Sequence, residues 1–369
     1  MNVTDLLGLL GGLALFLYGM QMMSAGLEDA AGNRMKQILE RLTANRFLGV
    51  AVGAGITAVI QSSSATTVMV VGFVNSGMMT LKQAVWIIMG ANIGTTITGQ
   101  LIALDVGALA PLFAFVGVVF IVFVKKVIFH HYGQIIAGLG ILFIGMEMMS
   151  SAMMPLRDSA AFVDLVSNFS NPFIGILAGA VFTALIQSSS ASVGILQALA
   201  VSGVIGLPTA VYVLFGQNIG TCVTAMMACA GTTKTAKRTA TVHLLFNVLG
   251  ATMFTIITLV TPFTDLVKSI SPDNVMMQIS IVHIFFNIVT TAILLPLSGY
   301  LVKLACRIIP GEDRQREALR LKYLDQRILN TPPIAVVQVL KEVERMGALA
   351  RENFLNSMEA IRTPKSWKR

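Results

Sequence analysis

The residues TAVIQSSS at positions 57–64 recur as TALIQSSS at positions 183–190, and each run lies in the middle of a long apolar stretch. The two stretches, 47–78 and 172–205, are too long for one membrane helix, which needs about 20 apolar residues. Each is therefore predicted to form a re-entrant helical hairpin. A broken backbone at membrane depth is tolerated only where protein buries it or where it lines a wet cavity, so the two runs indicate a functional site.

The surroundings of the two runs also repeat, at a constant offset of 126 residues. Matched positions include Asn45 and Asn171, Gly53 and Gly179, Thr57 and Thr183, and the stretches Asn92–Thr95 and Asn218–Thr221. Three predicted crossings separate the starts of the two units, and an odd number inverts the second unit. Inverted repeats with broken helices are typical of secondary transporters. The predicted first repeat is 1–130 and the second is 131–310.

The composition indicates an all-α polytopic membrane protein. Of the residues, 55% are hydrophobic and 12% are charged, against about 25% charged residues in soluble domains. Besides the two hairpins, seven apolar stretches are predicted to span the membrane. They are 5–24, 83–102, 107–124, 133–153, 208–229, 240–260 and 279–305.

The charges predict sidedness and a cytoplasmic tail. Before the last span, ten Lys and Arg fall on one side of this topology and two on the other, and basic residues stay on the cytoplasmic side. The protein is expected in the cell membrane, with its C-terminus cytoplasmic. The net charge of +8 is thereby explained without nucleic acid. Segment 27–43 is amphipathic and is expected on the membrane surface.

The two polar runs predict an anion site. Helices are expected to begin at Ser62–Ser64 and at Ser188–Ser190, where free N–H groups, a partial positive charge and hydroxyl donors can bind an anion without Arg or Lys. Two such starts that converge suit a small tetrahedral oxyanion. The alternative is that Ser and Gly only permit close helix packing. The occurrence of two matched runs makes this alternative the less favoured one.

A second repeated motif predicts a cation site. It comprises Asn92, Gly94, Thr95 and Thr98 in one half and Asn218, Gly220, Thr221 and Thr224 in the other. Unwound carbonyls with Asn and Thr oxygens form the kind of site that holds sodium beside a substrate; the alternative is a glycine kink with self-capped Thr hydroxyls. Glu147 is the only acid within an apolar span, which argues against a carboxylate proton relay.

Two further pairs, His243 with Asn247 and His283 with Asn287, put His and Asn on one helical face. Helix packing is the favoured role, with gating or the substrate path and metal binding as alternatives. A serine hydrolase is disfavoured because an enzyme needs one nucleophile, whereas these serines are duplicated. No enzyme activity and no organic cofactor are expected.

These residues resemble the type II sodium-dependent phosphate cotransporters, including their bacterial members. The paired Gln-Ser-Ser-Ser runs, the two Asn-Ile-Gly-Thr stretches and the His-x-x-Phe-Asn segments carry the likeness, over residues 5–305. The resemblance implies phosphate as substrate, sodium as the coupling ion and alternating access. It places phosphate at the two polar runs and sodium near Gln61, Asn218, Thr221 and Thr224. By the repeat, the candidate sodium ligands also include Gln187, Asn92, Thr95 and Thr98.

We therefore expect a sodium-driven importer of inorganic phosphate. The alternatives are a carrier of another oxyanion, such as sulfate or arsenate, and a membrane phosphate sensor or scaffold. Residues 311–369, with apolar positions at helical spacing, resemble the beginning of the helical phosphate-signalling regulator found in bacterial members. The expected partners are phosphate, sodium and the lipid bilayer. A second copy of the chain, in a homodimer, and a cytoplasmic regulator that docks on this tail are further candidates.

Overall fold

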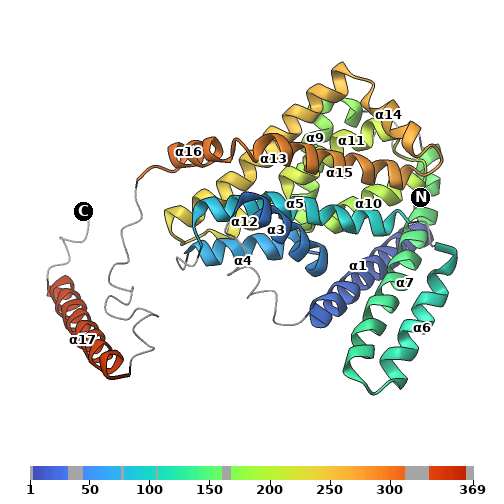
Figure 1. The fold of residues 1–369 in the computed structure, drawn as a ribbon. Coiled ribbons are helices and arrows are strands. Elements are labelled where there is room, and N and C mark those ends of the chain that lie inside the picture. Colours follow the sequence, from blue (N-terminus) through green and yellow to red (C-terminus); the bar gives the residue numbers. More distant parts are fainter. Residues whose placement is uncertain are drawn as a thin grey trace. The chain divides into compact units, whose positions relative to one another are not determined.

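The computed structural model describes residues 3–31, 45–75, 79–104, 107–159, 168–311 and 332–362. The chain divides into two compact units, Met1–Pro310 and Gly311–Arg369. The helices of the first unit (Figure 1) are α1 (Val3–Ala31), α3 (Arg46–Ile60), α4 (Ser63–Asn75), α5 (Leu81–Ile102), α6 (Ala110–Phe123), α7 (Val127–Met153), α9 (Pro172–Ile186), α10 (Ser189–Val201), α11 (Leu207–Gly220), α12 (Cys222–Ala228), α13 (Lys234–Val260), α14 (Phe263–Ile270), α15 (Val275–Leu294) and α16 (Ser298–Ile308).

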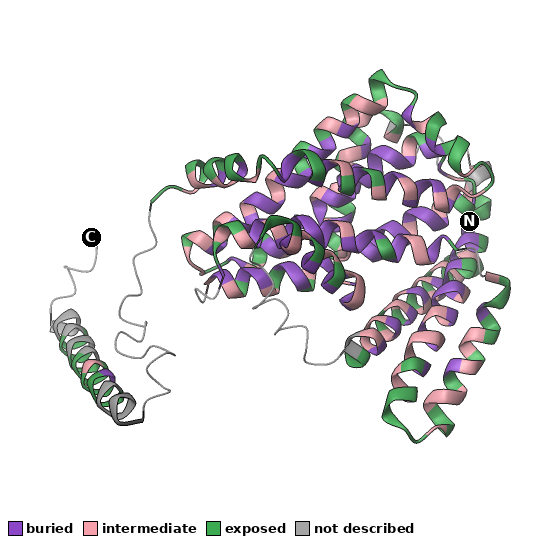
Figure 2. Cartoon of the chain, in the orientation of Figure 1, coloured by how far each residue is buried: buried purple, intermediate pink, exposed green. Residues whose placement is uncertain are grey.

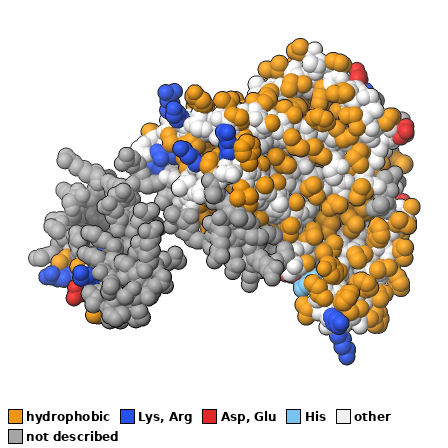
Figure 3. Space-filling model, viewed as in Figure 1, with side chains coloured by type: hydrophobic (Ala, Val, Ile, Leu, Met, Phe, Trp, Pro, Cys, Tyr) orange, Lys and Arg blue, Asp and Glu red, His pale blue; other side chains and the backbone are white. Residues whose placement is uncertain are grey.

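Within the described residues, six helical segments are long and apolar enough to cross a membrane. They are Val3–Leu27, Leu81–Ile102, Val127–Leu156, Leu207–Ala228, Lys234–Val260 and Val275–Leu294. This confirms a multi-pass, all-helical membrane protein. Figure 3 shows apolar side chains covering much of the visible face of this unit, as a surface in contact with lipid requires.

The prediction of seven spans needs two corrections. The stretch 107–124 forms a shorter apolar helical segment, Gly107–Phe123. The predicted span 279–305 is not one helix, because α15 ends at Leu294 and α16 begins at Ser298. Pro296 explains the break, since its ring blocks a helical hydrogen bond and disfavours the helical conformation of the residue before it.

Helices α1 and α7 pack against each other in opposite directions, with α6 on the other side of α7 (Figure 1). A Cβ added at Gly12 would meet the backbone of Gly145, and one at Gly19 would meet that of Gly138. Positions 12 and 138, and positions 19 and 145, are 126 residues apart. Exchanging the two halves of the sequence therefore reproduces this pair of contacts.

The helices around the two polar runs also pack alike in both halves. A Cβ added at Gly53 of α3 would clash with the carbonyl oxygen of Ile87 in α5. A Cβ at Gly179 of α9 would clash in the same way with Val213 in α11, and both positions lie 126 residues further on. Glycine thus lets the backbones of each pair approach closely.

The buried centre of the unit lies around α5, α10, α11 and α15, in each of which more than half of the residues are buried (purple in Figure 2). Phe215 of α11 stacks on Phe286 of α15 with ring centroids 5.3 Å apart, and Phe254 of α13 packs at 5.3 Å from Phe286. These rings belong to one apolar cluster that also contains Val193 of α10 and Val282 of α15.

In the second unit the described helix is α17 (Pro332–Arg362). Its exposed apolar side chains include Val339, Leu340 and Val343, and Arg345 forms an ion pair with Glu342. Residues 312–331 and 363–369 of the predicted tail lie outside the described residues, as do residues 32–43 of the predicted surface segment.

Replacing Gly90 or Gly216 with Ala is expected to destabilise the protein by about 1–3 kcal/mol, the usual cost of overpacking a tight core. The added methyl would clash with the carbonyl oxygen of Val50 or of Ile176. Gly55→Ala is the matched control, because a Cβ there meets nothing within 4 Å. Thermal unfolding of the detergent-purified protein measures the effect. Equal melting temperatures for Gly90→Ala and Gly55→Ala would contradict this packing.

Candidate functional site

Each polar run begins with a glutamine in an unusual backbone conformation. Gln61 ends α3 with φ 57°, and Gln187 ends α9 with φ 60°; they are the non-glycine residues with positive φ among the described residues. Their backbone N–H groups donate to the carbonyl oxygens of Thr57 and Thr183. The left-handed conformation costs about 1–2 kcal/mol for a residue with a Cβ, and such strain concentrates at functional sites.

The serines that follow start the next helices, as the sequence predicts. Ser62 Oγ accepts from the backbone N–H of Ala65 at 3.1 Å, and Ser188 Oγ accepts from Ala191 at 3.2 Å. These are N-cap bonds, which satisfy one of the free donors at each helix start. The first residue of α4 is Ser63 and the first residue of α10 is Ser189, so both hydroxyls stand at the positive ends of helices.

The two helix starts meet. Ser63 Oγ lies 3.4 Å from Ser189 Oγ, and these side chains are 2% and 8% exposed. The two residues are 126 positions apart and so correspond in the repeat. The contact therefore joins equivalent positions of the sequence repeat.

Hydroxyls of the second motif surround this contact. Thr95 Oγ1 lies 3.4 Å from Ser189 Oγ. Ser190 Oγ donates to Thr98 Oγ1 at 3.4 Å, and in the equivalent pair Thr224 Oγ1 donates to Ser64 Oγ at 3.2 Å. We call these residues the hydroxyl cluster. Its members are Ser63, Ser64, Thr95, Thr98, Ser189, Ser190 and Thr224.

The two glutamines differ. Gln61 is 5% exposed, and its Oε1 accepts from Thr98 Oγ1 at 2.7 Å. Gln187 is exposed. Thr224, the counterpart of Thr98, donates to Ser64 and to the carbonyl oxygen of Thr221. The bond between Thr98 and Gln61 therefore has no counterpart in the other half, where Thr224 does not bond Gln187.

The expectation of a broken helix at the second motif is wrong in the first half. Helix α5 runs without interruption through Asn92 and Thr98. In the second half the break is confined to Thr221, between α11 and α12, with φ −57° and ψ −27°. The Thr221 hydroxyl donates to the Gln217 carbonyl and the Thr224 hydroxyl to that of Thr221. Such back-bonding lets threonine stay in a helix without freeing carbonyls.

The two asparagines do not join the hydroxyl cluster through their amide nitrogens. Asn92 donates to the Ile88 carbonyl at 3.1 Å, and Asn218 donates to that of Leu214 at 2.9 Å. Asn218 Oδ1 lies 3.3 Å from His283 Nε2. The structure thus brings together Asn218 and His283, which the sequence left in separate motifs.

The other members of the His and Asn pairs are buried on α13 and α15. Asn247 donates to Cys222 Sγ at 3.3 Å, and Asn287 donates to the carbonyl oxygen of His283. Both ring nitrogens of His243 and the Oδ1 atoms of both asparagines are buried without a hydrogen-bond partner in the structure. Unpaired buried polar groups destabilise a fold. Their presence on α13 and α15 therefore suggests a role for these helices besides packing.

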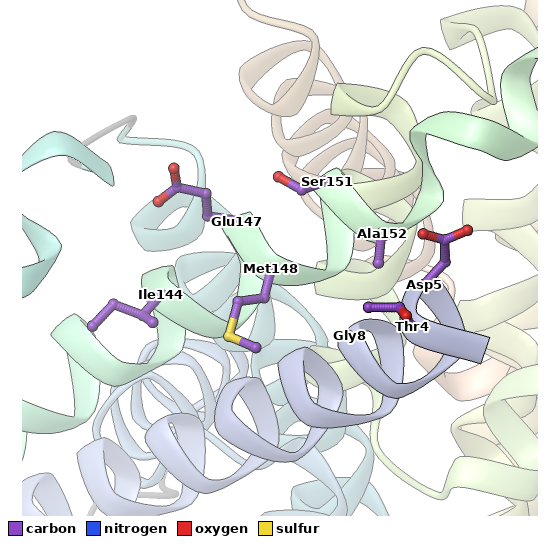
Figure 4. Close-up of a pocket in the computed structure, with 8 residues that line it drawn as sticks. All are labelled: Thr4, Asp5, Gly8, Ile144, Glu147, Met148, Ser151 and Ala152. Carbon is purple, nitrogen blue, oxygen red and sulfur yellow. The ribbon is translucent and has the colours of Figure 1, made fainter. Parts of the chain in front are cut away.

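Glu147 lies apart from this cluster. It lines a groove of about 470 Å³ between α1 and α7, together with Asp5 and Ser151 (Figure 4). Its side chain is exposed. The carboxylate therefore takes no part in the hydroxyl cluster, whose members are all neutral.

Two contacts near the cluster escape prediction from sequence. Thr57 Oγ1 donates to Thr66 Oγ1 at 3.0 Å beneath the first polar run. Gln197 Nε2 bonds the Gly99 carbonyl at 3.1 Å and Ser280 Oγ at 2.9 Å, which ties α10 to α5 and α15. Gln197 stands alone within the apolar part of α10, and this isolated polar residue is the signal from which a contact between helices could have been predicted.

Apolar helices packed around buried, neutral polar groups at helix ends define a multi-pass membrane protein with an internal polar site. The chain belongs to the Na+/Pi-cotransporter family, whose model matches residues 15–151 and 158–294. The two matched segments follow one another along the membrane unit, and the first extends beyond the predicted repeat boundary at residue 130. This is a family of transporters.

Several curated relatives are similar in sequence. The "Putative inorganic phosphate export protein YjbB" of Salmonella typhimurium is 29% identical over 357 residues, 96% of this chain and 65% of that protein. The "Uncharacterized protein YqeW" of Bacillus subtilis is 33% identical over 298 residues, 80% of this chain and 96% of that protein. The human "Sodium-dependent phosphate transport protein 2B" is 38% identical over 105 residues, 28% of this chain and 15% of that protein.

The chain thus spans 65% of the length of the Salmonella relative. No solved structure matches it.

Cysteines at positions 63 and 189 are expected to form a disulfide under mild oxidation, because the two serine Oγ atoms lie 3.4 Å apart. The two cysteines are introduced into a variant in which the native Cys222, Cys229 and Cys306 have been replaced. A pair at 63 and 202 is the control, since position 202 ends α10, about 20 Å along the helix. Mass spectrometry of the oxidised protein identifies the cross-linked peptides. Equal cross-linking of both pairs, or none in either, would contradict the contact.

Proposed function

We propose that this protein is a carrier that couples the transport of inorganic phosphate to sodium. The observation that carries the proposal is the meeting of two helix starts, α4 and α10, through Ser63 and Ser189 in a buried cluster of neutral hydroxyls. Helix N-termini and hydroxyls are the groups that bind phosphate without a formal charge. Family membership and the names of the relatives support phosphate over other substrates.

In this proposal phosphate binds at Gln61–Ser64 and Gln187–Ser190. Each run offers the backbone N–H groups of a helix start and a row of hydroxyls, and the two rows face each other through Ser63 and Ser189. Hydroxyls both donate and accept, so they can bind a phosphate in either of its ionisation states near neutral pH. A site without fixed positive charge also releases its anion more readily.

The lack of a positive side chain in the cluster gives a physical reason for sodium coupling. A phosphate anion that leaves water for a buried site pays a large desolvation cost unless an opposite charge accompanies it. Sodium supplies that charge and takes neutral oxygen ligands. The candidate ligands are Thr95, Thr98 and Thr224 of the cluster and Gln61 Oε1, which accepts from Thr98. The repeat adds Gln187, Asn92, Asn218 and Thr221 as further candidates.

The direction of transport follows the gradients in this proposal. A sodium symporter imports phosphate when sodium flows inward, which is the direction that the sequence favours. The Salmonella relative is named for export, which makes outward movement the alternative. Transport of another oxyanion, or phosphate sensing without transport, are the remaining alternatives.

Alternating access between two inverted halves is part of the proposal. The antiparallel contacts of α1 and α7, which correspond in the repeat, support opposite orientations of the halves. The difference between Gln61 and Gln187 supports a carrier in one of two states. Exchange of their roles, with Thr224 bonding Gln187 and Thr98 released, describes the second state.

Ser63→Ala and Ser189→Ala are each expected to lower sodium-dependent phosphate uptake about ten-fold or more, because a hydrogen bond to a charged group contributes about 1.5–3 kcal/mol. Uptake of radioactive phosphate into proteoliposomes is measured with inward and with outward sodium gradients. Ser150→Ala is the matched control, since this serine is buried but donates to Ala198 outside the cluster.

Each alternative predicts a different result in this assay. Uptake that is indifferent to sodium contradicts the coupling, and stronger uptake of sulfate contradicts the substrate. Phosphate binding without accumulation identifies a sensor. Normal uptake in both serine variants would move the phosphate site elsewhere.

Inversion of the halves predicts that equivalent positions lie on opposite sides of the membrane. Lys82 and Pro208 are both exposed, stand at the starts of α5 and α11, and are 126 residues apart. In a cysteine-free background, Pro208→Cys is expected to react with a membrane-impermeant thiol reagent in intact cells, and Lys82→Cys only after permeabilisation. Lys234→Cys and Asp273→Cys report the inner and outer sides. Labelling of 82 and 208 from one side would make the repeats parallel.

A further inference from the structure

A small basic groove lies at the start of α3, α5 and α16. Arg46 is the first residue of α3, and Lys82 is the second residue of α5. Ser298 opens α16 there, and Trp86 and Val302 complete the apolar part of the lining. The groove has a volume of about 180 Å³, which corresponds to about six water molecules at 30 Å³ each.

Helix α16 is fixed in place and forms a firm wall of this groove. Its Leu301 and Ala305 are buried, in one apolar cluster with Val85 of α5. Its C-terminal end is held by Arg238, whose Nε and Nη2 donate to the carbonyl oxygen of Ile309 at 3.1 and 3.0 Å. The groove is therefore built by three anchored helices.

The outer face of α16 is apolar and exposed. Tyr300 is 69% exposed, and Leu304 and Ile308 also point outward. Lys303 and Arg307 lie on the same helix. An amphipathic helix of this kind, directly after the last span, lies in the membrane interface. The groove consequently opens at the depth of lipid headgroups.

Among the described residues, no acidic side chain neutralises the positive charge of the groove. Arg46 and Lys82 are exposed, and neither takes part in an ion pair among the described residues. The start of α16 adds its partial positive charge. Figure 3 shows Lys and Arg side chains gathered around the end of the unit where α16 lies. This end has the excess of basic residues that predicts the cytoplasmic face.

We propose that this groove binds the headgroup of an anionic phospholipid. Two cations from different helices can contact one phosphate, and basic pockets between membrane helices on the cytoplasmic side are suited to such headgroups. The indole of Trp86 and the side chain of Val302 line the groove together with the cations, so the start of an acyl chain can pack there. A free phosphate ion would gain nothing from these apolar groups, so they favour lipid over free phosphate.

The site is distinct from the hydroxyl cluster. None of the seven cluster residues lines the groove. The lipid proposal therefore stands or falls independently of the transport proposal, and its test measures lipid binding without transport.

The test is native mass spectrometry of the detergent-solubilised full chain with added phosphatidylglycerol or phosphatidylcholine. Phosphatidylglycerol is expected to be retained in preference to phosphatidylcholine. The double variant Arg46→Gln/Lys82→Gln is expected to lower its affinity about 30-fold, since each cation beside an anionic headgroup contributes about five-fold. The single variant Lys82→Gln, with a loss of about five-fold, serves if the double variant is unstable.

Lys125→Gln/Lys126→Gln is the matched control. It removes the same charge from the α6–α7 connection, which lies away from α16 (Figure 1), and is expected to retain phosphatidylglycerol like the unaltered chain. Equal losses in the two double variants would reduce the effect to general surface charge and overturn the site. Displacement of phosphatidylglycerol by millimolar inorganic phosphate would identify a free-phosphate site and likewise overturn the lipid proposal.

Discussion

Two helices that begin inside the protein, α4 and α10, impose the constraint on which the rest of the membrane unit depends. The first turn of any helix has backbone N–H groups without intrahelical partners, and in a membrane no water is available to satisfy them. The chain meets this demand with Ser62 and Ser188 as caps. To bring these starts together, the chain must reverse sharply after α3 and α9, and both times it does so at a glutamine with positive φ.

Close packing by glycine follows from the same constraint. The helix pairs α3 with α5 and α9 with α11 must approach until backbone meets backbone, or the threonines of α5 and α12 would not reach the serine runs. Gly53 and Gly179 permit this approach, because a single added methyl would clash with a carbonyl oxygen in either half. The hydroxyls then form a cluster in which the serines of each run meet threonines of the other half.

The sequence allowed the helix starts, the 126-residue repeat and the meeting of the serine runs to be predicted, because capping residues and glycines obey local rules. The starts of α4 at the Ser62 cap and of α10 at the Ser188 cap are examples. Local rules failed where several interactions compete. The Asn-x-Gly-Thr motif was expected to unwind α5, but that helix stays intact, with the Asn92 amide bonded to the Ile88 carbonyl and Gly94 packed against the backbone of Ala54. The strained Gln61 conformation could not be predicted either, because tertiary contacts must offset the free energy that this left-handed conformation costs.

Several contacts of the cluster correspond in the repeat, which makes the contacts without a counterpart informative. Ser63 meets its equivalent Ser189, and the pair Ser190 with Thr98 corresponds to the pair Ser64 with Thr224. Two contacts have no counterpart. Thr95 lies beside Ser189, whereas Thr221 donates to the Gln217 carbonyl. Thr98 bonds Gln61, whereas Thr224 bonds a backbone carbonyl. For a pseudo-symmetric chain, the exchanged arrangement costs nearly the same free energy, because it uses the same residue types. The proposed alternating access requires two states close in energy, and a switch of one hydroxyl between glutamine and carbonyl is a small enough change to connect two such states.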